Sequence, residues 1–314
     1  MAFSIGSAVG SGFTLIGRRP VTVVSWGFFV YLTIFVLLGI GVALIGLPAL
    51  EKLASLNGQT PDRAQAAQMV LGVFAALWPA FLLVMIGSIV VSVMVQGAVF
   101  RSILEPDHKA YFSLRLGGAE GALLLLMLLY IPIFVVVWLV SAVIVGGLFF
   151  AAHYLHGLAG GLVAFFGCVA YALVFMWIAL RFSMAAPMTF AERRVRFFGS
   201  WTMTKGEGWG LFGLAWVMVL VWFGVTIGYS IVSAIVNAVF GGGAMAMIFA
   251  SSGGSAGSDP NALLSHWPIL ALAYLPSFIL GAAFNGVLQA IVQGPWVDVY
   301  RQLRGSPEVA STFT

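Results

Sequence analysis

Of the 314 residues of this chain, 61% are hydrophobic and only 8% are charged, and the mean hydropathy is +1.07. In a water-soluble domain roughly a quarter of all residues are charged, so this composition excludes a soluble globular protein. The net charge of +4 comes from basic residues clumped between long uncharged stretches. That distribution indicates membrane topology, and we expect no nucleic-acid partner.

The uncharged stretches predict six transmembrane helices, because a helix needs about 20 apolar residues to cross the hydrocarbon core of a bilayer. In chain order these helices are expected near residues 21–47, 69–100, 122–151, 159–182, 210–239 and 268–297. A β-barrel is excluded, since runs such as GALLLLMLLYIPIFVVVWLV are apolar on every side and do not alternate. The predicted fold class is an all-α integral membrane protein, forming a single polytopic domain over residues 1–314.

The basic residues lie mainly on one side of the predicted membrane domain. The side that holds both termini carries Arg18, Arg19, Arg101, Lys109, Arg115, Arg181, Arg193, Arg194, Arg196, Lys205, Arg301 and Arg304. The other side carries only Lys52 and Arg63. Because short cytoplasmic loops are rich in lysine and arginine, this bias predicts that both termini lie in the cytoplasm.

An internal repeat links the second and sixth predicted helices. PAFLLVMIGSIVVSVMVQG at 79–97 aligns without gaps to PSFILGAAFNGVLQAIVQG at 276–294, with the same distance from proline to the Gln-Gly pair. This pattern predicts three parallel hairpin repeats, which divide the chain at about 1–104, 105–190 and 191–303 and leave a short tail at 304–314. Amphipathic cytoplasmic interfacial helices are expected to introduce the hairpins, from the segments 13–26, 111–124 and 201–214.

A stripe of polar side chains runs along the repeated helices. Asn285, Gln289 and Gln293 are spaced by four residues and share one helical face, and Gln96 aligns with Gln293. An unpaired amide in lipid costs several kcal/mol, so the stripe should face other helices or a cavity. Two interpretations follow: hydrogen bonds between helices, or a ligand path in which Arg181 meets an anionic headgroup.

The segment after the fourth predicted helix mixes arginines with aromatic residues. Such a mixture suits a helix at the level of the lipid headgroups, with aromatics buried shallowly and cations on phosphates. The expected headgroup contacts are Arg193, Arg194, Arg196, Trp201 and Lys205. An ordinary basic cytoplasmic loop with interfacial aromatics is the alternative interpretation.

The same segment, RFSMAAPMTFAERRVRFFGSWTMTKGEGWGLFG at 181–213, resembles bacterial multi-helix proteins related to the membrane domain of glycerophosphodiester phosphodiesterases. The matching positions are Arg181, Phe182, Ala186, Pro187, Glu192, Ser200, Trp201, Thr204, Lys205 and Gly206, and Met203 stands where that family usually has leucine. The resemblance implies a bacterial inner-membrane protein. It does not imply an enzyme, because the phosphodiesterase chemistry of that family belongs to a separate soluble barrel domain.

Motifs for catalysis or metal binding are scarce. His153 and His156 form an H-x-x-H pair in an outer loop, but a metal would need further ligands. The candidates for these ligands are distant in sequence: Glu51, Asp62, Asp259 and His266. The sequence contains no phosphate-binding glycine loop, zincin motif or nucleophile elbow. We therefore expect no catalytic residues, no metal and no cofactor.

Together these patterns predict a non-enzymatic protein of the bacterial inner membrane that binds or organises lipid or supports a membrane complex. Its expected partners are the anionic headgroups at the cytoplasmic face and a protein of such a complex. The alternative is a carrier or flippase for an amphipathic, lipid-like substrate.

Overall fold

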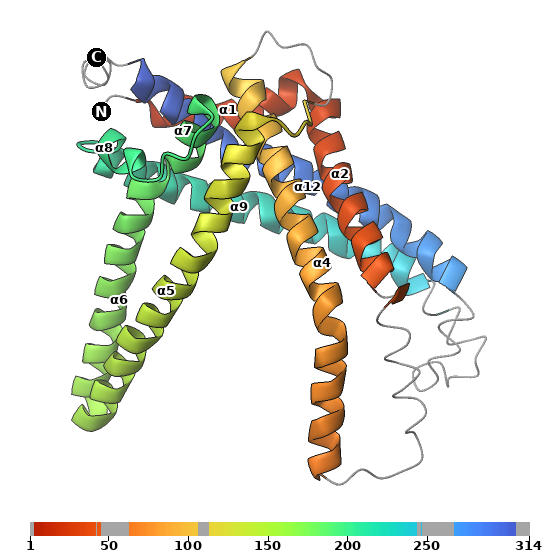
Figure 1. The fold of residues 1–314 in the computed structure, drawn as a ribbon, viewed down its shortest axis with the longest axis horizontal. Coiled ribbons are helices and arrows are strands. Elements are labelled where there is room, and N and C mark those ends of the chain that lie inside the picture. The colour runs from red at the N-terminus through yellow and green to blue at the C-terminus, as the bar shows by residue number, and fades with distance from the viewer. Residues whose placement is uncertain are drawn as a thin grey trace. The chain divides into compact units, whose positions relative to one another are not determined.

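The computed structural model describes residues 3–41, 43, 44, 63–105, 113–243, 246 and 267–305, and within these ranges it is helical and contains no β-strand. Its main helices are α1 (Ile5–Arg18), α2 (Pro20–Gly41), α4 (Arg63–Leu104), α5 (Gly118–Leu155), α6 (Gly157–Phe182), α7 (Ala185–Glu192), α8 (Gly199–Met203), α9 (Gly208–Val236) with its π-helical continuation η2 (Asn237–Gly241), and α12 (Trp267–Arg304) (Figure 1).

Six helical segments of the described chain are long and apolar enough to cross a membrane. They are Pro20–Gly41, Leu77–Leu104, Gly118–Leu155, Gly157–Glu192, Gly208–Gly241 and Pro268–Arg304. The predictions of an all-α fold and of six helices long and apolar enough to span a membrane are therefore confirmed for the described residues. Several helices extend beyond the predicted bounds, because charged residues such as Arg101 and Arg304 continue the helical turns past the apolar run.

The chain forms two compact units. The first unit comprises Met1–Gly17, Gln96–Val221 and Ala290–Thr314, and the second comprises Arg18–Val95 and Trp222–Gln289. The helices α4, α9 and α12 each contribute one part to each unit. The two units are described separately below.

In the first unit, α5 and α6 form an antiparallel pair (Figure 1). The turn between them is tight, with positive φ angles of 46° at His156 and 56° at Gly157. Gly160 faces the backbone of Ala152, and the hydroxyls of Ser141 and Tyr171 are hydrogen-bonded. Small residues and hydroxyl pairs are the usual means by which membrane helices approach one another.

The core of the first unit lies near the end at which α5 begins and α6 ends. Its largest fully buried side chains come from α4, α5, α9, α12 and the segment around α7, namely Phe100, Leu123, Leu126, Met184, Met188, Leu211, Leu214 and Leu303. α1 belongs to this core through Ala8, Gly12 and Leu15, which recur on one helical face. The buried core of the first unit thus lies at the same end as the buried residues Arg101 and Glu120.

In the second unit, α2 packs against the first part of α12. A side chain at Gly27 would overlap the backbone of Ala282 and Gly286, so the two helices approach closely. The ring of Tyr31 meets Phe278 edge to face at 5.6 Å between centroids. These contacts make a small-residue interface with an aromatic border.

Two of the three segments expected to form interfacial helices are each divided between two helices. Residues 13–26 cover the end of α1 and the start of α2, and residues 201–214 cover the end of α8 and the start of α9. Before α5, however, residues 113–117 are non-helical, and α5 begins at Gly118. The expected helix over 111–124 is therefore not a separate element in the described residues, because Glu120 caps the start of the long helix α5 from within.

Candidate functional site

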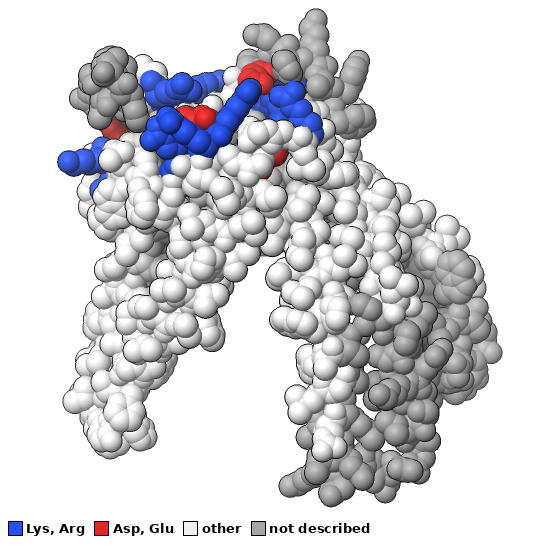
Figure 2. Space-filling view, in the orientation of Figure 1, with Lys and Arg blue, Asp and Glu red and all other residues white. Residues whose placement is uncertain are grey.

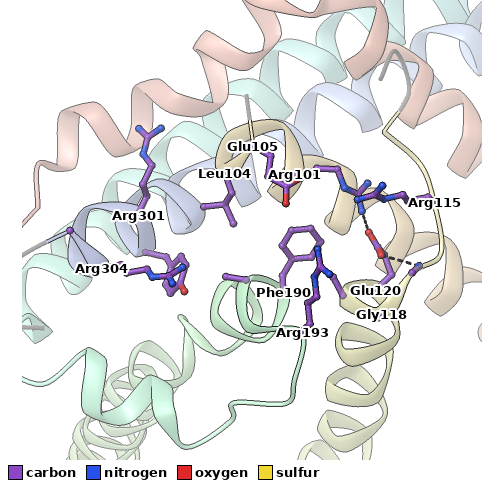
Figure 3. A pocket seen from close by; sticks show the side chains of 15 residues that line it. Arg101, Leu104, Glu105, Arg115, Gly118, Glu120, Phe190, Arg193, Arg301 and Arg304 are labelled. Carbon is purple, nitrogen blue, oxygen red and sulfur yellow. Dashed lines mark hydrogen bonds and ion pairs between the residues drawn. The ribbon is translucent and has the colours of Figure 1, made fainter. Parts of the chain in front are cut away.

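A pocket of about 790 Å³ lies in the first unit, between the ends of α4 and α12, the start of α5 and the end of α7. Its arginines come from four separate segments and are Arg101, Arg115, Arg193, Arg301 and Arg304. Figure 2 shows that basic side chains gather at this end of the unit, where α5 begins and α6 ends, while the flanks of these two helices carry none. Figure 3 shows the labelled side chains around the pocket.

A buried ion pair forms one wall of the pocket. Arg101 of α4 pairs with Glu120 of α5, and the two residues are only 2% and 1% exposed. Glu120 also accepts a hydrogen bond from the Gly117 backbone at 3.0 Å, and Arg101 donates to the carbonyl of Ser113. These bonds hold segment 113–117 in place, because the side chains of Arg101 and Glu120 bond to the backbone at both of its ends.

Gly97 lets this ion pair form. A Cβ atom at Gly97 would lie 3.0 Å from the Glu120 side chain, closer than nearly all real contacts. Gly294 aligns with Gly97 in the sequence and packs closely against α1. A Cβ atom at Gly294 would lie 3.0 Å from the Cα atom of Gly12. The glycine of each Gln-Gly pair therefore marks a place where another element packs against the helix that carries it, α4 or α12.

Three further arginines converge on the pocket from different segments. Arg115 lies on the segment 113–117, and Arg304 ends α12. Arg193 follows α7 with a left-handed backbone, φ 55° and ψ 29°, and its N–H bonds to Phe190. A positive φ at a non-glycine residue is uncommon, and here it turns the chain so that Arg193 lines the cavity.

The pocket carries a surplus of positive charge. Arg101 is compensated by Glu120, and Arg301 by the buried carboxylate of Asp298. Among the described residues, no carboxylate lies within ion-pair distance of Arg115, Arg193 or Arg304. Among the described residues that line the pocket, Glu105 is the one other acidic residue. In this described part of the lining, three arginines against one glutamate leave a net charge of about +2 facing the cavity.

Part of the pocket wall is apolar or aromatic. Phe190 packs edge to face on Phe100 at 5.5 Å, and the Arg101 guanidinium lies 5.7 Å above the Phe190 ring. Leu104 and Tyr300 complete this side of the lining. The site thus combines guanidinium groups with a smaller apolar wall, an arrangement that suits an anionic group attached to carbon.

The predicted headgroup arginines divide into two groups. Arg193 lines the pocket, whereas Arg194 and Arg196 both pair with Glu192, at 3.2 and 2.6 Å. Lys205 is exposed, and the ring of Trp201 packs against Trp177 at 5.4 Å. Residues that are neighbours in sequence therefore have different surroundings.

Arg181 belongs to a network at the end of α6. Ser200 donates to the Arg181 carbonyl at 2.6 Å and accepts from the Met184 backbone at 3.1 Å. The Arg181 side chain donates to the carbonyl of Thr204 at 2.5 Å and lies over the rings of Trp177 and Trp201, at 5.1 and 5.7 Å. This network ties α6 to α8 and gives a physical reason for the serine, tryptophan and threonine of the segment 181–213.

A second cavity, of about 420 Å³, lies beside this network. Arg181 lines it together with the aromatic rings of Trp177, Trp209 and Phe212. The Nε atom of Arg181 is buried and makes no hydrogen bond to any of the described residues. The cavity is otherwise apolar.

The predicted stripe of amides is divided between the two units. Gln96 and Gln293 belong to the first unit, and Asn285 and Gln289 belong to the second. The side-chain carbonyls of Gln96 and Asn285 are buried and have no hydrogen-bond partner among the described residues, while Gln289 and Gln293 have interaction partners. None of these four amides lines the arginine-lined pocket or the cavity beside Arg181.

The rings of His153 and His156 lie 5.6 Å apart at the end of α5. The four candidate co-ligands, Glu51, Asp62, Asp259 and His266, lie outside the described residues. Within the part of the chain that the structure describes, no group of three His, Cys, Asp or Glu side chains is placed to hold a metal ion.

Sequence analysis missed the pocket as a site, although it counted all five arginines as topology signals. One local signal was available: Glu120 lies three residues after Gly117, the spacing at which a carboxylate accepts a hydrogen bond from the backbone N–H at the start of a helix. The convergence of Arg115, Arg193 and Arg304 has no such signal, because it depends on packing between distant segments. No family model, curated protein or solved structure matches this chain.

Proposed function

We propose that this chain is a non-enzymatic protein of the bacterial inner membrane that binds anionic lipid headgroups and thereby organises lipid in the cytoplasmic leaflet. The observation that carries the proposal is the arginine-lined pocket. Arg115, Arg193 and Arg304 present guanidinium groups to one cavity without a carboxylate partner among the described residues. Guanidinium groups bind phosphate in a bidentate geometry, which makes them the preferred side chains for headgroup recognition.

The level of the pocket along the helices supports a lipid ligand. Membrane-length segments end at Leu104 and Arg304 and begin at Gly118, and these three residues line the pocket. The ends of membrane-spanning helices lie in the headgroup region of the bilayer. A phosphate at this depth therefore belongs to a lipid or to a solute at the membrane surface.

The orientation with cytoplasmic termini is part of the same proposal. Nearly all basic residues of the sequence precede or follow the apolar segments on the side of the termini. The cytoplasmic leaflet has a negative surface potential, which attracts basic residues near the membrane. The resemblance of segment 181–213 to bacterial membrane domains supports the same location.

We also propose that the chain consists of three hairpin repeats. Gly97 and Gly294 support this, since they occupy aligned positions and each packs closely against another element. The antiparallel pair of α5 and α6 is the middle hairpin of this scheme.

The proposal is tested by lipid-dependent thermal stability of the purified full chain. A ligand that binds only the folded state raises the unfolding temperature by mass action. We expect phosphatidylglycerol to raise it more than phosphatidylcholine does. The combined variant Arg115→Gln, Arg193→Gln and Arg304→Gln should lose most of this difference.

The matched control removes the same charge outside the pocket, through Arg18→Gln, Arg194→Gln and Lys205→Gln. It should keep most of the difference between the two lipids. Equal stabilisation by both lipids, or equal losses in both triple variants, contradicts the proposal. Movement of a labelled phospholipid from one leaflet to the other, in proteoliposomes that contain the chain, would instead favour the carrier hypothesis.

A further inference from the structure

We infer that the ligand of the arginine-lined pocket is a phosphate monoester, that is, a headgroup or solute that ends in a free phosphate. This inference rests on the proposed function and goes further by naming the chemical class that the pocket selects. Two properties of the site carry the inference: the charge facing the cavity, and the number of separate segments that supply it.

The charge of the pocket matches a dianion. Arg101 and Arg301 are compensated by Glu120 and Asp298, so in the described part of the lining Arg115, Arg193 and Arg304 face Glu105 alone, a surplus of about +2. A phosphate monoester carries about −1.5 to −2 charges near pH 7. A phosphodiester, such as the phosphate of phosphatidylglycerol, carries a single negative charge. Only the monoester neutralises the whole surplus.

The arrangement of the arginines suits the three terminal oxygens of a monoester. Arg115, Arg193 and Arg304 belong to a loop, to the turn after α7 and to the end of α12, and they approach the cavity from different sides (Figure 3). A terminal phosphate offers three exposed acceptor oxygens, whereas a diester offers two. Each donor segment can therefore reach its own oxygen only in the monoester.

The size of the pocket indicates that the ligand also contains the carbon-based group to which the phosphate is attached. A cavity of about 790 Å³ exceeds what a bare phosphate needs and lies in the range of sites for small molecules of about 300–1,000 Å³. Leu104, Phe190 and Tyr300 provide a wall for carbon atoms next to the charged groups. A glycerol phosphate has both parts that this pocket can contact, a charged phosphate and a carbon backbone, whether it carries acyl chains or is a free solute.

The experiment measures binding of three lipids to the full chain in one mixture, by native mass spectrometry from micelles that contain equal amounts of phosphatidic acid, phosphatidylglycerol and phosphatidylcholine. Phosphatidic acid is the monoester and phosphatidylglycerol the diester. We expect roughly a tenfold preference for the monoester, the size of effect that one additional charge-assisted hydrogen bond gives.

Single variants locate the preference. Arg115→Gln, Arg193→Gln and Arg304→Gln should each reduce the preference for phosphatidic acid over phosphatidylglycerol to about twofold or less. Arg194→Gln is the matched control, because it removes the neighbouring charge outside the cavity and should keep the preference. Glu105→Gln removes the opposing carboxylate and should tighten binding of the monoester, a gain that no loss of folding can imitate.

A second arm distinguishes a lipid from a soluble ligand. Glycerol 3-phosphate and inorganic phosphate are titrated against the chain in phosphatidylcholine nanodiscs. Displacement of bound phosphatidic acid by micromolar glycerol 3-phosphate assigns the site to a soluble monoester, and failure of millimolar concentrations to displace it assigns the site to the lipid. Both outcomes support the inferred class.

The two proposals fail in different ways. If phosphatidic acid and phosphatidylglycerol bind equally well, and both better than phosphatidylcholine, the monoester inference is wrong and the proposed function stands. If neither anionic lipid binds better than phosphatidylcholine, both are wrong. A preference for the monoester that persists in all three arginine variants places its origin outside the pocket and overturns the inference.

Discussion

At the scale of single residues, the ion pair between Arg101 and Glu120 is the support of the candidate site. The partners are almost completely buried, and their hydrogen bonds reach Ser113 and Gly117 on the segment that presents Arg115. Burying an ion pair is costly, and its net contribution to stability is often small. We therefore regard its main effect as positioning: it fixes the segment from which Arg115 reaches the cavity.

Removing one partner of this pair should destabilise the protein strongly. Glu120→Gln keeps the size of the side chain and leaves the buried Arg101 guanidinium without its counter-charge, a change that typically costs about 3–5 kcal/mol. We expect a marked fall in the thermal unfolding midpoint in detergent or nanodiscs. Glu105→Gln, an exposed carboxylate at the rim of the same pocket, serves as the control and should leave the midpoint nearly unchanged. Similar midpoints for the two variants would show that the pair is not buried as described.

Arg193 and Arg194 show how one residue step separates two roles. Arg193 adopts a left-handed backbone after α7 and lines the pocket, while Arg194 pairs with Glu192 and keeps 65% of its side chain exposed. An exposed pair of this kind contributes about 0–1 kcal/mol and leaves the arginine near solvent. The two arginines therefore make a matched pair for mutagenesis, with equal charge and unequal surroundings.

At the scale of helices, glycine sets how closely the elements of the first unit approach. In α1, a Cβ at Gly12 would lie 2.7 Å from the carbonyl oxygen of Ala290, whereas one at Gly10 would have no heavy atom within 4 Å. The side chain of Gln302 fastens the same helix at its start, where it accepts from the Ser4 backbone and donates to Ser7, both at 2.9 Å. α1 is thus held on α12 by close backbone contacts at Gly12 and by the side-chain amide of Gln302.

Gly12→Ala should loosen this attachment and Gly10→Ala should not. Both changes raise helix propensity by up to about 1 kcal/mol, but only the first places a methyl group against the backbone of α12. We expect faster hydrogen exchange in α1 of Gly12→Ala and equal or slower exchange in Gly10→Ala. If α1 of Gly12→Ala were as protected as that of the unsubstituted chain, the close contact with α12 would be refuted.

At the scale of the whole molecule, α5 is long and apolar enough to cross a bilayer, so we expect its two ends on opposite sides of the membrane. The pocket and Lys205 lie at the end where α5 begins, and Tyr154 lies in its last turn. The bias of basic residues predicts that the pocket end is cytoplasmic. This orientation decides which leaflet supplies the proposed ligand.

The orientation is checked by cysteine labelling in a Cys168→Ser background, because Cys168 is the only cysteine of the sequence. Tyr154→Cys should react with a membrane-impermeant maleimide in cells with an intact inner membrane. Lys205→Cys should react only after the membrane is opened. The reverse pattern would place the pocket on the outer side and contradict the proposed cytoplasmic site.

The sequence alone determined the fold class and the membrane-length helices. An uncharged apolar run of sufficient length has one stable structure in lipid, since all backbone hydrogen bonds must be made within the segment. For this reason the helices were predicted close to their positions in the structure. Most of the basic residues between them were predicted to lie on one side of the membrane. Boundaries were less accurate at Leu104 and Arg304, because helical turns continue into the polar residues that follow.

The tertiary structure alone decided which of these basic residues form a site. Arg115, Arg193 and Arg304 are alike in sequence to Arg18, Arg194 and Arg196, and nothing in the local pattern separates the two groups. They differ because Glu120 holds the segment 113–117, because the backbone turns left-handed at Arg193, and because α12 ends beside α4. Convergence on a pocket depends on contacts between residues far apart in the chain, whereas periodicity and composition report only on neighbours.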